Sequence, residues 1–378
     1  MRRTHVITGA TGLIGAALVL ELAPHPDTGA IICPVRAGDG DGHARLTAAL
    51  TTAARAYRTD ADTVAQALRL VTAVAADLTR PGLGLDPARL RTAGPLWFWH
   101  VGALVGFGRA NRRRPFATNT AGTRRTVTLA AQLDAEAFHY VSTVYVAGHR
   151  QGEIPEEPIT TPTPRECYEA SKIAAERIVW NAPLPTRIYR PTAVIGHHTT
   201  LACGGPYSGV YGMMRRIALH HALRPGLDGG HHPVRLLAHP ELPINLVPVD
   251  HVTRELVDIA HATTRHRVFH LSNPTPPTVG ATLGAIFGQL GIADYELVPD
   301  PVRLRAPDLH LAHLLHEFYS AYLTHDQRFR RDHTRAALTH PDCSRYPMDD
   351  ALLNRFFAHY HRHELARRHR TDAVPGPA

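Results

Sequence analysis

Short apolar runs alternate with longer amphipathic stretches through the first half of the chain. The runs that predict buried strands are His5–Thr8, Ala30–Val35, Leu68–Val74, Leu96–Val101, Ala137–Val141 and Thr186–Tyr189. Apolar residues recur with helical spacing between them, in Leu13–Ala23, Arg45–Ala56, Asn119–Leu133 and Tyr168–Asn181. This alternation is typical of βαβ units. We therefore predict an α/β fold, a Rossmann doubly wound parallel sheet with right-handed crossovers.

The pattern changes near His197, where loops rich in Gly, Pro and His begin to separate the helices. A helix over Val249–His261 and a strand over Arg267–Leu271 are expected to complete the sheet, and Leu304–Tyr322 and Asp349–His369 have the clearest late helical periodicity. We predict a dinucleotide-binding domain over residues 1–196, completed by about 246–275. A smaller, mostly helical substrate-binding region is predicted over 197–245 and 276–371, and a disordered tail over 372–378.

Composition and charge narrow the class of protein. An apolar content of 44% and a charged content of 20% are ordinary for a soluble globular protein. The apolar runs are too short for a membrane span. The net charge of +8 raises the question of nucleic-acid binding, but the arginines are dispersed and their densest run, Arg112–Arg114, is short. We predict a solvated basic surface and no nucleic-acid partner, with docking of an acidic protein as a second reading.

The cysteines and histidines do not have the spacing of a metal site. The four cysteines are scattered, which suits a reducing cytoplasm. The 27 histidines follow the general composition, and several pairs lie in loop-like surroundings. We therefore predict no metal site and a cytoplasmic protein.

A glycine-rich loop follows the first strand and opens the first helix. Its sequence is Thr8-Gly9-Ala10-Thr11-Gly12-Leu13-Ile14-Gly15. In such loops the first glycine permits a tight turn, the second lets the backbone approach a pyrophosphate, and the third lets the helix pack on the strand. The helix N-terminus then offers free N–H groups to phosphates. We predict that a dinucleotide binds here, at Thr8, Gly9, Thr11, Gly12, Leu13, Ile14 and Gly15.

The residues after the second and third strands indicate which dinucleotide binds. Arg36 ends the second strand and Arg45 begins the next helix. An arginine at this place suits the 2′-phosphate of NADP(H), which we predict as the cofactor. Asp77, followed by Leu78, comes after the third strand, where it is placed to accept a hydrogen bond from the adenine amine; a turn-starting aspartate is the alternative.

One lysine stands among the 41 lysine and arginine residues of the chain. It is Lys172, four residues after Tyr168, so the two side chains are neighbours on one helix. An ammonium beside a phenol favours the phenolate, which lowers the tyrosine pKa and makes a poised general acid. A surface Tyr–Lys pair is the alternative.

Three further polar residues belong to the same candidate site. Thr143, with Ser142 as the fallback, follows the fifth strand, and side chains at the carboxyl end of a parallel strand face the ligand crevice. Asn119 either orders a water molecule for proton relay or caps its helix.

With these residues in place, the chain resembles the extended short-chain dehydrogenase/reductases, and within them the thioester-reductase and fatty-acyl-CoA-reductase branch. The resemblance covers about residues 4–275. Its motifs are the glycine loop, Val35-Arg36-Ala37, Asp77–Leu85, His100-Val101-Gly102-Ala103, Val141–Gly148, Tyr168–Lys172 with Glu176, Arg190–Gly196 and Val247–Val252. Two residues depart from the branch: Ile173, and Pro34 within the second strand.

The resemblance implies a role for each matching position. Tyr168 protonates the developing oxyanion, Lys172 lowers the Tyr168 pKa and binds the nicotinamide ribose, and Thr143 hydrogen-bonds the carbonyl oxygen. The other cofactor-binding positions that it implies are Gly102, Ala103, Pro191, Thr192 and Val194. It further implies hydride transfer from NADPH to an acyl thioester on CoA or on an acidic carrier protein, giving an aldehyde or, after a second reduction, an alcohol. The alternatives are a ketone or aldehyde reductase or hydroxyl dehydrogenase acting on a small metabolite, and a non-catalytic nucleotide-binding scaffold.

Overall fold

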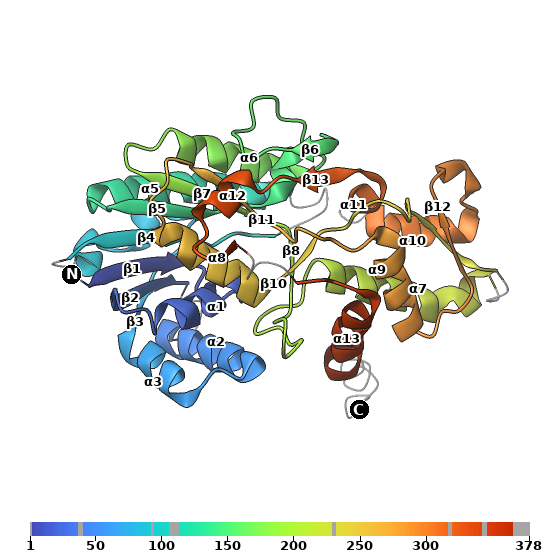
Figure 1. The fold of residues 1–378 in the computed structure, drawn as a ribbon, viewed down its shortest axis with the longest axis horizontal. Coiled ribbons are helices and arrows are strands. Elements are labelled where there is room, and N and C mark those ends of the chain that lie inside the picture. Colours follow the sequence, from blue (N-terminus) through green and yellow to red (C-terminus); the bar gives the residue numbers. More distant parts are fainter. Residues whose placement is uncertain are drawn as a thin grey trace, which may run out of the picture. The chain divides into compact units, whose positions relative to one another are not determined.

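The computed structural model describes residues 2–36, 41–91, 94–105, 113–228, 232–316, 320–341 and 346–365. The chain divides into two compact units (Figure 1). Unit 1 comprises residues 1–206, 247–274 and 329–344, and unit 2 comprises residues 207–246, 275–328 and 345–378.

Unit 1 is built around a parallel sheet of seven strands. In spatial order these are β11 (Val268–Leu271), β7 (Thr186–Pro191), β5 (Ala137–Val141), β4 (Leu96–His100), β1 (Arg3–Thr8), β2 (Thr28–Val35) and β3 (Val71–Ala75). Every pairing within it is parallel. The predicted doubly wound sheet is confirmed, and its strand order reverses between β1 and β4, where such sheets bind ligands at the carboxyl ends of the strands.

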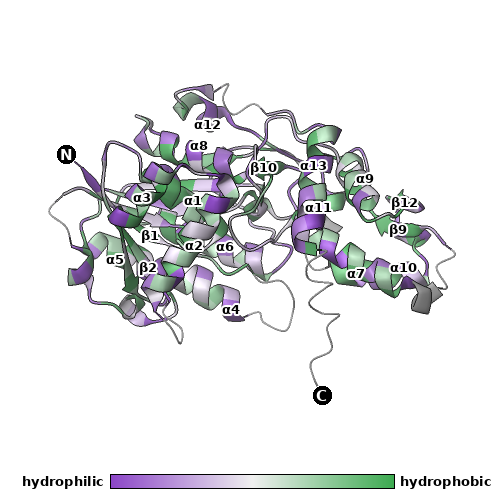
Figure 2. Cartoon of the chain, turned by 90° about the horizontal axis from the view of Figure 1, so that it is seen from below, coloured by the Kyte–Doolittle hydropathy of each residue, from purple (hydrophilic) through white to green (hydrophobic). Residues whose placement is uncertain are grey.

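Helices cover both faces of this sheet, α5 and α6 on one side and α1 and α8 on the other (Figure 1). The helices of unit 1 are α1 (Leu13–Leu22), α2 (Gly42–Tyr57), α3 (Ala61–Leu70), α4 (Arg113–Pro115), α5 (Ala121–Gln132), α6 (Cys167–Trp180), α8 (Val249–His261) and α12 (Asp332–Ala337). Hydrophobic residues run along the strands and along α1 (Figure 2), and β4 is buried along its whole length. Burial on both faces explains why these strands form continuous apolar runs.

Unit 2 is mostly helical. Its helices are α7 (Val210–Asp228), α9 (Val279–Gln289), α10 (Ala306–His316), α11 (Ser320–Thr324) and α13 (Asp350–Tyr360). The strands β9 (Val234–Leu237) and β12 (Tyr295–Val298) form a small parallel pair. A π-helical turn over His361–Leu365 follows α13, and the predicted disordered tail lies outside the described residues. That unit 2 binds the substrate stays a prediction.

The strand predicted over Leu68–Val74 is wrong in its first half. Residues up to Leu70 belong to α3, and β3 begins at Val71. Asp60 starts this helix, because its side chain accepts a hydrogen bond from the Thr63 N–H at 2.8 Å. Pro34 does lie inside a strand with two neighbours, but the ladder between β2 and β1 ends at Ile32, so the missing N–H costs that ladder nothing.

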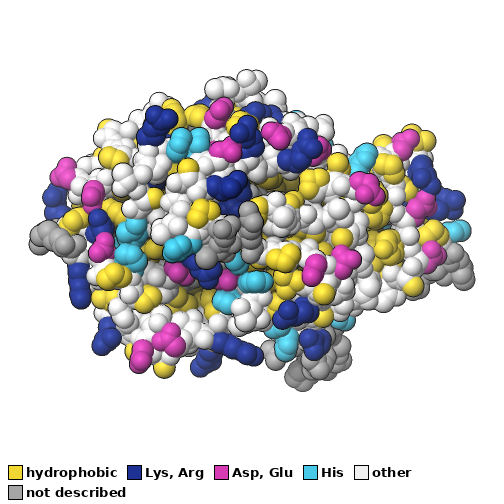
Figure 3. Space-filling view, in the orientation of Figure 1, with side chains coloured by type: hydrophobic (Ala, Val, Ile, Leu, Met, Phe, Trp, Pro, Cys, Tyr) yellow, Lys and Arg dark blue, Asp and Glu magenta, His cyan; other side chains and the backbone are white. Residues whose placement is uncertain are grey.

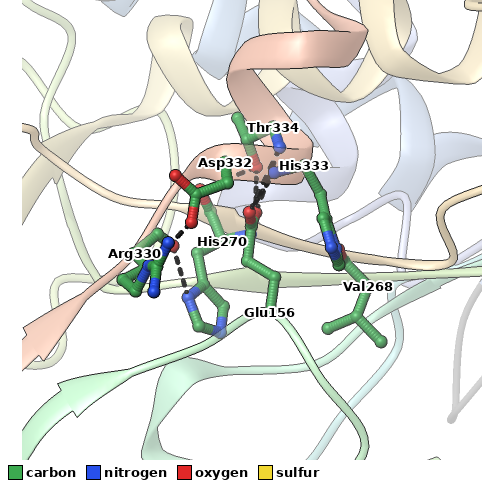
Figure 4. A network of polar contacts seen from close by, with 7 residues as sticks. All are labelled: Glu156, Val268, His270, Arg330, Asp332, His333 and Thr334. Atoms are coloured by element: carbon green, nitrogen blue, oxygen red, sulfur yellow. Dashed lines mark hydrogen bonds and ion pairs between the residues drawn. The ribbon is translucent and has the colours of Figure 1, made fainter.

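Residues 329–344 belong to unit 1, whereas the sequence pattern predicted them in the substrate-binding region. The Arg330 N–H donates to the Ile154 carbonyl oxygen, at the end of β6 (Gly152–Ile154), at 3.0 Å. A buried carboxylate, Glu156, holds the residues that follow (Figure 4). Glu156 is 4% exposed and accepts hydrogen bonds from the backbone N–H groups of His270 at 2.7 Å, His333 at 2.5 Å and Thr334 at 3.2 Å. The Thr334 hydroxyl donates a fourth at 2.5 Å. This tertiary bonding has no signature in the local sequence.

Replacing Glu156 by alanine is expected to lower the free energy of unfolding by about 2–4 kcal/mol, because two buried N–H groups and one half-buried N–H group lose their acceptor. Glu153, exposed on β6, is the matched control, and Glu153→Ala is expected to change stability by less than about 0.5 kcal/mol. Urea unfolding followed by circular dichroism measures both. Equal stability of the two variants would contradict the anchoring role of Glu156.

Candidate functional site

The glycine loop between β1 and α1 has no room for side chains. Gly9 has a φ of +76°, and a Cβ there would lie 2.6 Å from the Gly102 Cα. A Cβ on Gly15 would lie 2.1 Å from the Gly9 carbonyl oxygen. Gly12, at the N-cap of α1, donates its N–H to that oxygen at 2.9 Å and has no side chain with which to cap the helix. Gly12 therefore provides no side-chain cap for the first-turn N–H groups of α1. Uncapped N–H groups at a helix N-terminus can bind an anion such as a phosphate.

A cavity of about 200 Å³ lies beside this loop, at the carboxyl ends of β1 to β4. Nine of the predicted cofactor residues line it, namely Thr8, Gly9, Thr11, Arg36, Arg45, Asp77, Leu78, Gly102 and Ala103. Gly12, Leu13, Ile14 and Gly15 form the turn and the helix start next to it. Residues from four separate segments thus meet at the point where the strand order reverses, which is where the fold binds dinucleotides.

The polar residues of this cavity are held in place by local bonds. Arg45 Nη1 donates to the Arg36 carbonyl oxygen at 2.8 Å, and both side chains are exposed at the cavity. Asp77 Oδ1 accepts from the Thr79 N–H at 2.8 Å and from its hydroxyl at 2.7 Å, and these bonds hold the pKa of Asp77 below its usual value. Asp77 therefore starts a turn and also lines the cavity, so the two readings of it are compatible. Its contact with adenine stays a prediction.

His100, the last residue of β4, supports the loop from below, and the sequence predicted no role for its side chain. It pairs with Thr8 across the sheet, and its Nδ1 lies 2.7 Å from the Thr8 hydroxyl. Its Nε2 lies 3.0 Å from the Thr123 hydroxyl. Burial lowers the pKa of His100 to about 3, so the ring is neutral and fits between two hydroxyls. The sequence did contain a sign of this role, because His100 is a polar residue at the end of an otherwise apolar strand.

The predicted catalytic pair lies on the buried face of α6. Glu166 caps this helix and accepts from the Tyr168 N–H at 3.1 Å. Tyr168 is 8% exposed and Lys172 is 2% exposed. The Lys172 amine donates to the Val141 carbonyl oxygen at 2.9 Å and lies 4.4 Å from the centroid of the Tyr140 ring. Lys172 therefore reaches the carboxyl end of β5, which Ser142 and Thr143 directly follow.

The prediction that Lys172 lowers the Tyr168 pKa is wrong in this structure. Burial, followed by the charges of Glu166, Tyr145 and Glu169, raises the pKa of Tyr168 above its ordinary value. Burial also lowers the pKa of Lys172 to about 7, with Glu176 opposing it, so the amine is only partly charged at neutral pH. Spacing on the helix indicated the neighbours correctly but not their desolvation. Tyr168 remains protonated at neutral pH, which suits a proton donor.

Ser142 and Thr143 occupy different positions at the end of β5. The Thr143 hydroxyl accepts from the Tyr145 N–H at 3.3 Å and caps the 3-10 turn Val144–Ala147. Its own hydrogen is therefore available to an acceptor. The Ser142 hydroxyl oxygen is buried and has no hydrogen-bond partner within the described part of the chain. Both positions are compatible with the predicted contact to a carbonyl oxygen, and which of them makes it stays a prediction.

Asn119 does not cap its helix, and that alternative is wrong. It lies in a π-helical turn, Phe116–Thr120, and α5 begins after Thr120 without a side-chain cap. Its side chain accepts from the Leu104 N–H at 2.7 Å and donates to the Leu104 carbonyl at 3.0 Å and to the Ser171 hydroxyl at 3.0 Å. Asn119 thus ties the segment after β4 to α6. Its role toward a relay water stays a prediction.

The last predicted cofactor residues follow β7 along the chain. Pro191 ends that strand, Thr192 donates its N–H to the Leu271 carbonyl at 3.2 Å, and Val194 lies in β8 (Ala193–Ile195). None of the three lines the 200 Å³ cavity. Next to them, Arg190 and Glu176 form a buried two-pronged ion pair at 2.9 and 2.7 Å, which joins β7 to α6. Both residues were in the recognised motifs, but their pairing was not predicted.

Together, the glycine turn, the cavity at the strand reversal and the Tyr168–Lys172 helix define a nicotinamide-dinucleotide-binding oxidoreductase of the Rossmann class. Residues 7–256 match the family model of the NAD-binding domain described as male sterility protein. The chain belongs to this family, and its resemblance to the thioester-reductase and fatty-acyl-CoA-reductase branch of the extended short-chain dehydrogenase/reductases is confirmed.

Relatives of the chain include parts of large synthases. It is 30% identical over 303 residues to a linear gramicidin synthase polypeptide of Brevibacillus parabrevis, a match of 74% of the chain and 5% of that protein. It is 34% identical over 268 residues to the isonitrile lipopeptide synthase of Streptomyces coeruleorubidus, covering 68% of the chain and 16% of that protein. The chain thus spans only a small part of these relatives.

Among solved structures, the fold is similar to the terminal R domain from the myxalamid PKS-NRPS biosynthetic pathway. The TM-score is 0.70 at 24% identity, and the match covers 100% of this chain and 93% of that one. No described helix is long and apolar enough to cross a membrane.

Proposed function

We propose that the chain is an NADPH-dependent reductase that converts a carrier-tethered acyl thioester into an aldehyde. The observation that carries the proposal is the approach of Lys172 to the carboxyl end of β5, which brings the Tyr168 helix to Ser142 and Thr143. The relatives support the thioester, because the chain corresponds to a small part of peptide and lipopeptide synthases. An acyl group on a carrier protein or on CoA is the substrate class that we infer.

The residues of the chain would act on the substrate in two steps, reduction of the carbonyl and then loss of the thiol. NADPH, when bound, supplies the hydride. Tyr168 donates its phenolic proton to the carbonyl oxygen as negative charge develops there, and Thr143 donates a second hydrogen bond to the same oxygen. Lys172, held by the Val141 carbonyl, orients the ribose side of the site. The carbon–sulfur bond of the hemithioacetal then breaks: its hydroxyl proton returns to the Tyr168 phenolate, the thiolate takes a proton from water, and aldehyde and free thiol leave.

Incubation with NADPH and a panel of acyl thioesters tests this reaction. The panel contains acyl-CoA, acyl-pantetheine and acyl-carrier protein, with the matching free aldehydes and ketones alongside. We expect one NADPH oxidised per aldehyde and thiol formed, measured by NADPH absorbance and by mass spectrometry. Oxidation with free carbonyls but with no thioester would favour the small-metabolite reductase instead. NADPH binding without any oxidation would favour the non-catalytic scaffold.

NADP(H) rather than NAD(H) is the cofactor that we propose, because Arg36 and Arg45 both line the cavity and no acid ends β2. Arg36→Ala is expected to lower kcat/KM for NADPH by about 10–100-fold, as loss of a charged contact to the 2′-phosphate requires, and to leave NADH unaffected. Arg55→Ala, an exposed arginine on α2, is the control. An equal effect of Arg36→Ala on both cofactors would contradict the 2′-phosphate contact.

The partner surface and the cell location are proposed from charge and cysteine chemistry. The net charge of +8 suits an acidic carrier protein. On the face that Figure 3 shows, basic side chains are interspersed with acidic and apolar ones, so the proposal rests on net charge and not on one patch. Cys33 and Cys167 are thiols, which suits the cytoplasm.

A further inference from the structure

Two histidines and an aspartate meet at the amino-terminal edge of the sheet in unit 1, the edge opposite to the cofactor cavity. His25 and Asp27 lie between α1 and β2, and His261 is the last residue of α8. One potential metal-binding atom from each lies within 4.8 Å of the others. Among the residues that the structure describes, this is the only group of three or more His, Cys, Asp and Glu side chains that meets this limit.

The orientation of His261 leaves a nitrogen lone pair facing this cluster. Its Nδ1 lies 2.8 Å from the Val257 carbonyl oxygen, and a carbonyl oxygen can only accept, so Nδ1 carries the proton. Nε2 is then unprotonated in the neutral ring. It is shielded from solvent and has no hydrogen-bond partner within the described residues. A backbone carbonyl that fixes the tautomer in this way is the usual support of a metal-bound histidine.

Asp27 keeps a free carboxylate oxygen, and one ring nitrogen of His25 is only weakly engaged. Arg3 binds Asp27 Oδ2, which leaves Oδ1 of the same carboxylate. The His25 ring stacks on His261 with ring centroids 4.1 Å apart, and its Nδ1 receives only a long bond of 3.3 Å from the Asp27 N–H. Two stacked imidazoles beside a carboxylate, with a buried lone pair left over, gain little from one another. A shared cation would engage the free nitrogen of His261 and the free oxygen of Asp27, with His25 exchanging its long bond for a bond to the metal.

A cavity of about 360 Å³ opens beside the cluster. His25 and His261 line it, and so does His340. The cavity gives a path for an ion to enter and room for the water molecule that completes a four-coordinate site.

We propose that His25, Asp27 and His261 form a binding site for a divalent transition-metal ion of the zinc type. Two imidazoles and a carboxylate are a donor set that zinc accepts, with water in the fourth position. The ion links the connection between α1 and β2 to the end of α8 and takes no part in the reduction. The proposed site differs from the expectation that the chain holds no metal. The sequence could not indicate this site, because His25 and Asp27 are far from His261 along the chain and only the fold brings them together.

Titration of the EDTA-treated full chain with Co²⁺ and then Zn²⁺ tests the site. We expect one equivalent of Co²⁺ to give a visible absorption band of low coordination number, which Zn²⁺ removes, and a rise in melting temperature with Zn²⁺. His25→Ala and His261→Ala are each expected to weaken binding at least about tenfold and to abolish the band. Asp27→Asn is expected to weaken it less, because the amide oxygen remains a donor.

His340→Ala is the matched control, since His340 lines the same cavity but is not in the cluster. It is expected to keep the band and the Zn²⁺-dependent rise in melting temperature. Metal-free melting curves of all variants show whether each is folded. If a histidine variant is not folded, weaker Co²⁺ binding by Asp27→Asn supports the site and unchanged binding contradicts it. A band that survives in the folded His25 and His261 variants, or one lost equally in His340→Ala, would overturn the proposal, as would the absence of any one-equivalent band in the wild type.

Discussion

Tyr168→Phe is expected to lower kcat for thioester reduction by about 10²–10⁴-fold, the range found for loss of a positioned proton donor. The phenolic hydroxyl is the only group removed and the ring stays, and Tyr168 is buried on the inner face of α6, so the helix keeps its packing. NADPH binding is expected to change less than about twofold, because the phenol acts on the substrate carbonyl. Single-turnover NADPH absorbance measures the chemical step, and fluorescence titration measures NADPH binding.

The control for this variant is Tyr295→Phe, which removes a phenolic hydroxyl from a side chain of unit 2 that is 37% exposed. Its kcat is expected to stay within about twofold of the wild type. Burial raises the Tyr168 pKa, so this phenol stays protonated up to the ordinary pKa of tyrosine. The wild-type rate is therefore not expected to fall through Tyr168 deprotonation below that pH. Unchanged kcat in Tyr168→Phe would contradict the proton-donor role of Tyr168. If kcat fell in Tyr145→Phe but not in Tyr168→Phe, the proton donor would be Tyr145.

The cofactor end of the site could be predicted from the sequence because it is built from local constraints. Gly9 and Gly15 are required by contacts of 2.6 and 2.1 Å within one turn and the adjacent strand end, and such turns leave a glycine spacing in the sequence. The helices that open with a regular apolar pattern were likewise predicted. The start of β3 was not, because residues up to Leu70 are apolar enough for a strand while the Asp60 cap sets a helix.

Long-range packing decided what the sequence could not indicate. Lys172 owes its lowered pKa to burial against Val141 and Tyr140, which lie 31 and 32 residues earlier in the chain. The Asn119 side chain bonds to Leu104 and Ser171, which lie 15 and 52 residues away in the chain. Neither the helix cap nor the water relay considered from the local sequence included these bonds. Glu156 likewise anchors a segment more than 170 residues later. A titratable group's environment is a property of the fold, whereas a motif gives only its identity and its nearest neighbours.

Lys172→Met is expected to lower kcat/KM by at least about 100-fold without lowering the free energy of unfolding, because it removes a charge that is costly to bury and keeps the length of the side chain. Lys172→Arg is expected to lose most activity as well, since a guanidinium cannot replace the compact ammonium. NADPH affinity is expected to fall about tenfold in Lys172→Met, as the proposed ribose contact is lost. Steady-state kinetics, NADPH titration and urea unfolding measure the three effects.

The pH dependence of stability separates a functional lysine from a structural one. Burial lowers the pKa of Lys172 from 10.5 to about 7, so between these values the unfolded chain binds more protons than the folded one and wild-type stability rises with pH. Below pH 7 the folded chain carries the full cost of a buried ammonium. Lys172→Met is therefore expected to be more stable than the wild type near pH 6, with the difference shrinking toward pH 10. A less stable Lys172→Met at every pH, with activity falling only as the folded fraction falls, would show that this lysine supports the fold and not the reaction.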